Sequence, residues 1–307
     1  MSRPAPAWRQ SKSRVLAQAD AGAGHHWLDL EIEPPFELPR PGQFVQLLLR
    51  GPSPVLLPRP MSVASAARRV GTPGRGSGAV RLGFLYASVG AGTRALAALR
   101  PGAEVEVLGP LGRGFPTTIP GRPVLVAGGR GIAPLLFAAD ELARDPARAE
   151  REDAGRRPVF VFGARTRAAL VGLAEARRRV AAIGGRLHLC TDDGSAGTRG
   201  HAAALLARVA RELDGAIAVL ACGPHAMLKA VARWAASRNV PAWVAMESVM
   251  ACGTGVCRGC PLPRSAEARA AFDPALVPAL HGNREWAMCC TEGPVFAAGD
   301  LDWERIE

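Results

Sequence analysis

Lysine and tyrosine are almost absent from this sequence of 307 residues, which holds one tyrosine and only 5% aromatic residues. Lys12 and Lys229 are the only lysines, so arginine carries nearly all of the positive charge behind the formal net charge of +11. The arginines are scattered, and no basic stripe carries interleaved aromatic side chains. Nucleic acid is therefore not an expected partner. A solvated basic surface that attracts anionic cofactors explains the charge better.

Long apolar runs are missing as well. No run reaches the length needed to cross a bilayer, and the first residues have no apolar signal core, so no membrane segment is expected. The histidines show no metal-ligand spacing and no Ser/His/Asp order, which leaves no residue to assign as catalytic. A disulfide framework is not expected, because most of the 7 cysteines cluster near the C-terminus. Their distribution favours metal ligation in a reducing compartment, and we expect a cytoplasmic location.

The clustered cysteines have the spacing of an iron–sulfur site. They are Cys252, Cys257, Cys260, Cys289 and Cys290. A C-x4-C-x2-C run with a distant fourth cysteine is the spacing of plant-type [2Fe–2S] ligation, in which four thiolates hold the two irons. A structural zinc site with four cysteine ligands and a set of buried unpaired thiols are the alternatives, and both stay open at this point.

Glycine is interleaved with these cysteines. Gly253, Gly255 and Gly259 permit positive φ and close backbone approach, so that amide N–H groups can point at the cluster sulfurs. Of the two adjacent cysteines, Cys290 begins the segment Cys-Thr-Glu-Gly-Pro-Val-Phe, and neighbouring side chains on extended backbone point to opposite sides. We therefore expect Cys290, and not Cys289, to be the fourth ligand.

Changes in composition and in hydrophobic periodicity along the chain predict three units. Residues 1–12 are predicted to be a disordered lead-in. Residues 13–117 carry short β-type runs between Gly and Pro, with one helical patch at Thr93–Leu99, and predict a small antiparallel β-barrel. Residues 118–239 alternate apolar strands with helices, which predicts an α/β unit with a parallel sheet. Residues 240–307 hold the clustered cysteines, so the expected fold class is a multidomain α+β chain.

The second unit is predicted in more detail. Its expected strands begin at Val124 and continue with Pro158–Gly163, Arg186–Thr191 and Ala216–Cys222. Its expected helices are Leu135–Arg144, Arg167–Ile183, His201–Glu212 and Pro224–Ser237, and Asp145–Arg157 is predicted to be a charged surface connector.

Two short motifs in the first unit suit an anionic cofactor. Arg59–Ser62 combines a cation, a rigid turn and a hydroxyl, which can hold a flavin with Arg59 on a phosphate and Ser62 near the isoalloxazine edge. Such tetrads also occur by chance. Gly90–Thr93 opens the helical patch, where backbone N–H groups can meet a pyrophosphate. A plain turn capped by Thr93 is the alternative.

Further motifs lie at the predicted strand ends of the second unit. Gly128, Gly129 and Gly131 stand between a strand and a helix, which is the context of a nucleotide phosphate turn, although they do not form G-x-G-x-x-G. Asp192 and Cys222 lie at the carboxyl ends of strands, where open α/β sheets bind ligands. A buried structural thiol is the alternative for Cys222. Asp192 and Asp193 would repel a 2′-phosphate, which favours NADH over NADPH. The alternative is that Arg165 or Arg199 binds that phosphate.

Eight motifs together carry a resemblance to a known family. In chain order they are Arg59–Ser62, Gly90–Thr93, Gly109–Gly112, Gly128–Pro134, Thr191–Ser195, Cys222–Met227, Met250–Gly253 and Cys290–Phe296. They resemble the electron-transfer subunit of class 1B dihydroorotate dehydrogenases, within the ferredoxin–NADP⁺ reductase superfamily. The resemblance covers about residues 13–300. Each motif is modest alone, and their shared order makes the resemblance specific.

The resemblance implies an electron relay with FAD on the barrel, NAD(H) on the α/β unit and a [2Fe–2S] cluster in the C-terminal unit. The implied FAD contacts are Arg59, Pro60, Met61, Ser62, Leu85, Tyr86, Ala87, Gly92 and Thr93. The implied cluster ligands are Cys252, Cys257, Cys260 and Cys290. The implied partner is an FMN-containing catalytic subunit that oxidises dihydroorotate to orotate in pyrimidine synthesis, in a heterotetramer of two plus two subunits.

The sequence departs from the family's pattern in three places. Ala87 stands where an arginine is expected, Glu292 replaces an aspartate, and Arg264–Arg284 is predicted to be an inserted surface excursion. Two other functions stay open. The chain could be the relay subunit of another NAD(P)H-linked oxidoreductase, such as a sulfhydrogenase or a ferredoxin-linked transhydrogenase. It could also be a zinc-stabilised nucleotide-binding scaffold without redox activity.

Overall fold

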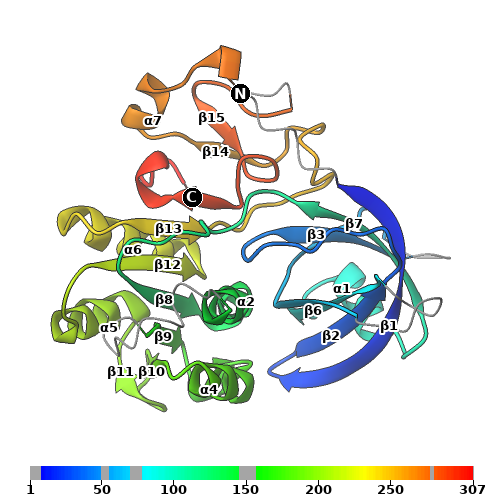
Figure 1. Ribbon diagram of the computed structural model, residues 1–307, viewed down its shortest axis with the longest axis horizontal. Coiled ribbons are helices and arrows are strands. Elements are labelled where there is room, and N and C mark those ends of the chain that lie inside the picture. The colour runs from blue at the N-terminus through cyan, green and yellow to red at the C-terminus, as the bar shows by residue number, and fades with distance from the viewer. Residues whose placement is uncertain (1–7, 50–54, 70–77, 145–156, 277–279, 307) are drawn as a thin grey trace.

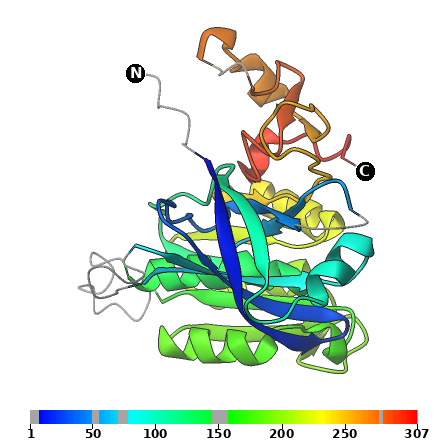
Figure 2. The same ribbon diagram turned by 90° about the vertical axis from the view of Figure 1, so that its right-hand side faces the viewer.

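The computed structural model contains two seven-stranded sheets and a small C-terminal ribbon, and it describes residues 8–49, 55–69, 78–144, 157–276 and 280–306 (Figure 1). The first sheet (blue to cyan) stands beside the second (green to yellow). The C-terminal segments (orange to red) lie at one end of the molecule in both views (Figure 2). No helix in these ranges is long and apolar enough to cross a membrane.

The first sheet is antiparallel throughout, with the order β4-β3-β7-β1-β2-β6-β5. Its strands are β1 (Arg9–Gly22), β2 (His25–Ile32), β3 (Phe44–Leu49), β4 (Arg59–Ser62), β5 (Ser65–Arg68), β6 (Val80–Ala87) and β7 (Glu104–Leu111). In β2, Leu28, Leu30 and Ile32 are at most 1% exposed and alternate with more accessible residues. This period of two places one face of the strand in the core.

The first sheet is a half-barrel. Its edge strands β4 and β5 are joined by only Val63 and Ala64, yet in the described part of the chain they are not hydrogen-bonded neighbours. The predicted antiparallel unit is thus confirmed. The prediction of a disordered lead-in was wrong for residues 9–12, because β1 begins at Arg9 and pairs with β7 from Gly109 onwards. Residues 1–7 lie outside the described ranges.

Helix α1 (Ala91–Ala97) follows β6, close to the helical patch that the sequence predicts at Thr93–Leu99. Its N-terminal turn is closed by Thr93, whose hydroxyl oxygen accepts from the backbone N–H groups of Val89 (2.9 Å) and Gly90 (3.0 Å). The same hydroxyl donates to the Gly90 carbonyl (3.2 Å). The local hydrogen bonds of Thr93 therefore fix the start of α1 against the end of β6.

The second sheet has the order β11-β10-β9-β8-β12-β13-β16, and only β16 runs antiparallel to its neighbour. Its strands are β8 (Arg122–Gly128), β9 (Val159–Ala164), β10 (Arg186–Thr191), β11 (Thr198–Arg199), β12 (Ile217–Cys222), β13 (Ala242–Ala245) and β16 (Val295–Ala297). The predicted parallel α/β sheet is confirmed. The strands β13 and β16 lie beyond residue 240 and still belong to this sheet, while the division of the chain into three domains stays a prediction.

Helices cover both faces of the second sheet. They are α2 (Ile132–Ala143), α4 (Leu173–Ala182), α5 (Ala202–Val209) and α6 (His225–Ser237). Side chains of α2 and α4 pack with Leu125 and Ala127 of β8, whereas side chains of α5 and α6 pack with Val124 and Val126 on the opposite face. The prediction of one continuous helix over Arg167–Ile183 was wrong. A 3-10 turn at Arg167–Ala169 is separated from α4 by Gly172, which has φ +73.

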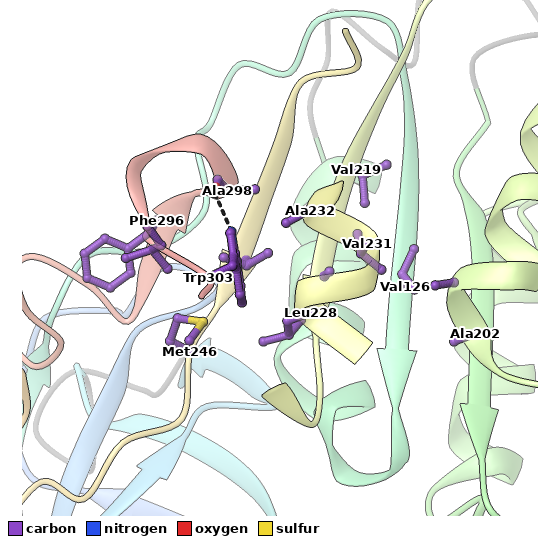
Figure 3. Close-up of a cluster of buried hydrophobic side chains, with 14 of the residues drawn as sticks. Val126, Ala202, Val219, Leu228, Val231, Ala232, Met246, Phe296, Ala298 and Trp303 are labelled. Atoms are coloured by element: carbon purple, nitrogen blue, oxygen red, sulfur yellow. Dashed lines mark hydrogen bonds between the residues drawn. The ribbon is translucent and has the colours of Figure 1, made fainter. Parts of the chain in front are cut away.

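The C-terminal unit is built on the ribbon of β14 (Pro261–Pro263) and β15 (Trp286–Met288), from which α7 (Ala266–Ala270) projects. The predicted connector Asp145–Arg157 falls mostly outside the described ranges. Figure 3 shows how the last residues of the chain join the second sheet. Trp303 donates its indole N–H to the Ala298 carbonyl (2.8 Å), and both residues belong to the buried cluster that includes Leu228 of α6.

The first sheet is tied to the rest of the molecule on two sides. Arg179 of α4 donates to the Ala64 carbonyl (3.0 Å) and pairs with Asp140 (2.8 Å) and Glu175 (2.5 Å). On the other side, a Cβ added to Gly112, which has φ +72, would lie 2.7 Å from Pro294 Cδ. The C-terminal segment therefore packs directly on the end of β7.

Candidate functional site

The guanidinium of Arg59 lies against the glycine-rich start of α1. A Cβ on Gly92 would be 3.0 Å from Arg59 Cζ, so only glycine leaves room for this side chain. The Nε atom of Arg59 is buried and has no hydrogen-bond partner. Buried N–H donors are normally paired, and a phosphate oxygen is a fitting partner for a guanidinium. Arg59 and Gly92, two of the implied FAD contacts, thus lie together, and the unpaired donor fits an anion.

The other residues expected near FAD divide into buried and accessible ones. Met61, Leu85 and Tyr86 are at most 8% exposed, and the Tyr86 hydroxyl donates to Gln18 Oε1 (3.2 Å). Burial raises the pKa of Tyr86. Its side chain is thus committed to the interior of the first sheet. The residues Pro60, Ser62, Ala87 and Thr93 are partly or fully accessible along the ends of β4 and β6 and the start of α1.

The glycine turn after β8 meets the end of β12. A Cβ on Gly128 would lie 2.7 Å from Pro224 Cδ, and a Cβ on Gly131 would clash with the Cys222 carbonyl oxygen. The chain runs from β8 outward to β9 and β10 and then returns to β12 on the other side of β8. The carboxyl ends of β8 and β12 therefore form the topological switch point, which is where such sheets bind ligands.

Cys222 and Asp192 occupy different places at this sheet edge. Cys222 is 5% exposed at the end of β12, and burial raises the pKa of its thiol. Asp192 follows β10, two strands away from β8, and is exposed. Its neighbour Asp193 instead accepts hydrogen bonds from the Ser195 backbone N–H (2.9 Å) and hydroxyl (2.6 Å). Asp192 can thus face only the distal part of a ligand that is centred at the switch point.

A cavity of about 820 Å³ opens at the carboxyl edge of β12 and β13. It lies between the start of α6 and the C-terminal unit, and its lining includes Pro224, His225, Glu247, Trp286 and Arg305. The volume is in the range of small-molecule sites. Of this lining, the sequence singled out only Gly223, Pro224 and His225, which belong to the motif Cys222–Met227.

The cysteine loop stabilises a thiolate at Cys252. Its Sγ accepts hydrogen bonds from the backbone N–H groups of Thr254 (3.4 Å) and Cys257 (3.5 Å). Burial acts to raise the pKa of Cys252, but these hydrogen bonds outweigh it and lower the pKa to about 6. Positive φ occurs at Gly253 (+75) and Gly255 (+85) as expected. The expectation for Gly259 was wrong, because the third positive φ of the loop falls on Arg258 (+57).

The ribbon of β14 and β15 brings the last two expected ligands together. Cys260 precedes β14, Cys290 follows β15, and the Cys290 backbone N–H donates to Cys260 Sγ (3.4 Å). Against the effect of burial, the contact with Cys290 lowers the pKa of Cys260 to about 7. Cys289 is turned away, with its thiol directed to the Met246 carbonyl (3.8 Å).

The four thiols lie in two pairs, an arrangement that is compatible with the ligand set of a [2Fe–2S] cluster. Among the described residues, no three His, Cys, Asp or Glu side chains are arranged to hold a metal ion. The structure does pair Cys260 with Cys290, and it places Cys252 and the exposed Cys257 on one loop. Each iron of a [2Fe–2S] cluster takes two of the four thiolates. Backbone N–H groups aimed at sulfur are also typical of such sites.

A buried ion pair behind the ligands was not recognised from the sequence. Arg264 and Glu292 form it with side chains that are 13% and 9% exposed. Glu292 also accepts from the backbone N–H groups of Gly282 (2.7 Å) and Met288 (2.8 Å). The excursion over 264–284 therefore starts from a buried anchor at Arg264 and is not a surface segment throughout. The sequence showed Glu292 only as a departure from the family's pattern.

Comparisons with known proteins agree with this geometry. Residues 125–233 match the family model described as an oxidoreductase NAD-binding domain. One solved structure, described as an NADH-dependent reduced ferredoxin–NADP oxidoreductase with flavin-based electron bifurcation, has a TM-score of 0.69 and 27% identity over 95% of this chain and 90% of its own. A Neisseria gonorrhoeae ferredoxin–NADP⁺ reductase, with a TM-score of 0.53 and 17% identity over 75% of this chain and 91% of its own, shares the fold.

Curated relatives extend over nearly the whole chain. The protein of Geobacillus kaustophilus is 33% identical over 86% of this chain and 88% of its own length. That of Desulforamulus reducens is 30% identical over 95% of this chain and 98% of its own. Both are named as the electron transfer subunit of dihydroorotate dehydrogenase B (NAD⁺). The chain therefore belongs to the family of electron-transfer subunits of NAD⁺-dependent dihydroorotate dehydrogenase B.

Proposed function

We propose that the chain passes electrons between NAD(H), FAD and a [2Fe–2S] cluster, and exchanges them with the FMN of a catalytic subunit that converts dihydroorotate to orotate. The names of the relatives and the match to an NAD-binding domain support this proposal. FAD supplies the conversion between two-electron hydride chemistry and one-electron steps when it is bound. The chain supplies binding, orientation and electrostatics.

One observation carries the proposal, namely that the cysteine-bearing unit packs directly on the sheet with the flavin motif. The Arg113 backbone N–H donates to the Gly293 carbonyl (2.5 Å), and Arg113 forms a parallel bridge with Pro294. Gly293 lies three residues after Cys290. On the first sheet, Arg113 follows β7, which pairs with β3, and β3 pairs with β4 and its Arg59–Ser62 motif. Such contact suits direct electron exchange between the two sites.

Each group of residues has its own proposed role in binding. Arg59 holds a phosphate of FAD, and Gly92 makes room for it. The turn Gly128–Gly131 lets a nucleotide approach the backbone at the switch point. Cys252, Cys257, Cys260 and Cys290 hold the two irons, with hydrogen bonds that favour the thiolate form. No side chain near these sites is proposed to act as a catalytic acid or base.

The assembly and its location are also proposals. We place the chain with an FMN-containing subunit in a heterotetramer of two plus two, in the cytoplasm. Seven free thiols in the structure support a reducing compartment.

A second candidate is a relay subunit of a ferredoxin-linked transhydrogenase. The solved structure with a TM-score of 0.69 comes from a ferredoxin–NADP oxidoreductase, which favours this candidate at the level of the fold. The curated relatives favour the dihydroorotate partner, because they match at 30–33% identity over 86–95% of the chain. The two candidates differ in the partner that accepts or donates the electrons.

The reconstituted chain alone should reduce a dye with NADH and fail to oxidise dihydroorotate. Each described unit is accounted for by FAD, nucleotide or cluster, and no sequence motif suggests a base that would take a proton from the substrate beside a second flavin. Addition of an FMN-containing dihydroorotate dehydrogenase subunit should start NAD⁺-dependent orotate formation. Orotate formation by the chain alone would contradict the proposal, and so would a complete pair that forms no orotate with NAD⁺.

Arg59→Ala should weaken FAD binding by about tenfold or more, because a charge-assisted hydrogen bond is worth roughly 1.5–3 kcal/mol. Ala87 supplies no second guanidinium at the position where the family has one. Retained FAD is measured after gel filtration and by fluorescence titration of the apoprotein. Arg81→Ala is the matched control, since Arg81 is an exposed arginine on β6 that pairs with Asp29 (2.6 Å). Equal FAD affinity in both variants would refute the role of Arg59.

Cys290→Ser should lose its iron, and Cys289→Ser should keep it. Cys290 contacts Cys260, whereas Cys289 is directed to Met246. The loss of metal affinity in Cys290→Ser should exceed the roughly 10–100-fold loss that follows removal of a hydrogen-bond partner of a metal ligand. Iron per chain and the visible absorption of the two variants decide the assignment. Iron retained by Cys290→Ser and lost by Cys289→Ser would reverse it.

A further inference from the structure

Gln46 is a fully buried polar residue in an apolar strand. It is 0% exposed in β3 and stands opposite Pro60 of β4, the strand with the proposed flavin motif. Its neighbours Val45 and Leu47 belong to the core of the first sheet. Since successive side chains of a strand point to opposite faces, Gln46 points out of that core.

The cysteine loop lies on the face to which Gln46 points. Gln46 Nε2 donates to the Met250 carbonyl (3.0 Å). A Cβ on Gly253 would lie 2.9 Å from both Cγ and Nε2 of Gln46. Met250 and Gly253 flank the proposed ligand Cys252. The amide N–H end of Gln46 therefore contacts the loop on both sides of Cys252. Gln46 belongs to β3, which pairs with the strand β4 that carries the flavin motif.

Packing alone does not account for this residue. Gln46 Oε1 is enclosed and has no hydrogen-bond partner, and an unpaired buried acceptor destabilises a fold. Phe44, two residues before it, and Met250, its hydrogen-bond partner, belong with Leu111 to the apolar cluster that joins the first sheet to the C-terminal unit. A methionine side chain has a similar length and would fill the space without an amide. The hydrogen bond of the amide to Met250 points instead to a role at the cysteine loop.

We propose that Gln46 is a positioning residue that couples the flavin strand to the cluster loop and raises the reduction potential of the cluster. This inference rests on the proposed relay function. The side-chain amide of Gln46 holds the Met250 carbonyl through its N–H group. The positive end of the amide dipole then faces the loop of Cys252. A positive dipole stabilises the additional electron of a reduced cluster, and hydrogen bonding around the cysteines is one of the factors that set the potential of such clusters.

The test is the midpoint potential of the cluster in the reconstituted full chain, measured by an EPR-monitored redox titration. In Gln46→Met the equilibrium for electron transfer from flavin to cluster should shift by about tenfold toward the reduced flavin. For a one-electron couple this corresponds to a fall of about 59 mV in the midpoint potential of the cluster. Gln46→Asn is too short to reach Met250 and should shift the potential in the same direction. Gln46→His restores an N–H donor of similar reach and should return the potential toward that of the unmodified chain.

Ser13→Ala is the matched control, because Ser13 is also buried in the first sheet and donates to a backbone carbonyl, that of Val105 (2.6 Å). Its cluster potential should equal that of the unmodified chain. The inference is overturned if the cluster potential of Gln46→Met or Gln46→Asn equals that of this control. It is also overturned if the potential of Gln46→His falls as far as that of Gln46→Met. An unmodified chain that NADH cannot reduce would instead refute the relay function itself.

Discussion

The contact between the end of β7 and the segment Gly293–Pro294 is the constraint on which the rest of the arrangement depends. At Gly112, with φ +72, any Cβ would meet Pro294, and the Arg113 backbone bonds to Gly293. These close approaches are possible only because two glycines meet there. They fix the cysteine-bearing unit on the same sheet that carries Arg59. The apolar cluster around Phe44 and Leu111 then excludes water from the junction.

Electrostatics at the two anionic sites follows one principle. At each site N–H donors lie at a partly or fully buried position, where an anion is a fitting partner. The guanidinium of Arg59 is the proposed donor to a phosphate on the first sheet, and the backbone N–H groups of Thr254 and Cys257 donate to Cys252 Sγ. Burial alone would disfavour the thiolate, and these donors oppose it and lower the pKa of Cys252.

Local patterns predicted the two sheets and most helices, because strand periodicity and glycine turns are short-range properties. The family resemblance implied Arg59 and Gly92 as separate FAD contacts, and only the structure shows that they lie against each other. The break at Gly172 and the pairing of Arg9–Lys12 with β7 depend on distant partners and could not be read locally. The same holds for Gln46 and for the ion pair of Arg264 with Glu292. A polar residue inside Phe-Val-Gln-Leu-Leu-Leu was the one sequence signal for Gln46, and its partner at Met250 is 204 positions away.

The central claim is that flavin and cluster exchange electrons within this one chain. The most direct measurement is an anaerobic NADH titration of the reconstituted chain without any partner, followed in the flavin and iron–sulfur absorption bands. The account predicts that both sets of bands bleach, and that the reduced cluster gives an EPR signal. Bleaching of the flavin with the cluster left fully oxidised, at potentials where a chemical reductant does reduce it, would contradict the account.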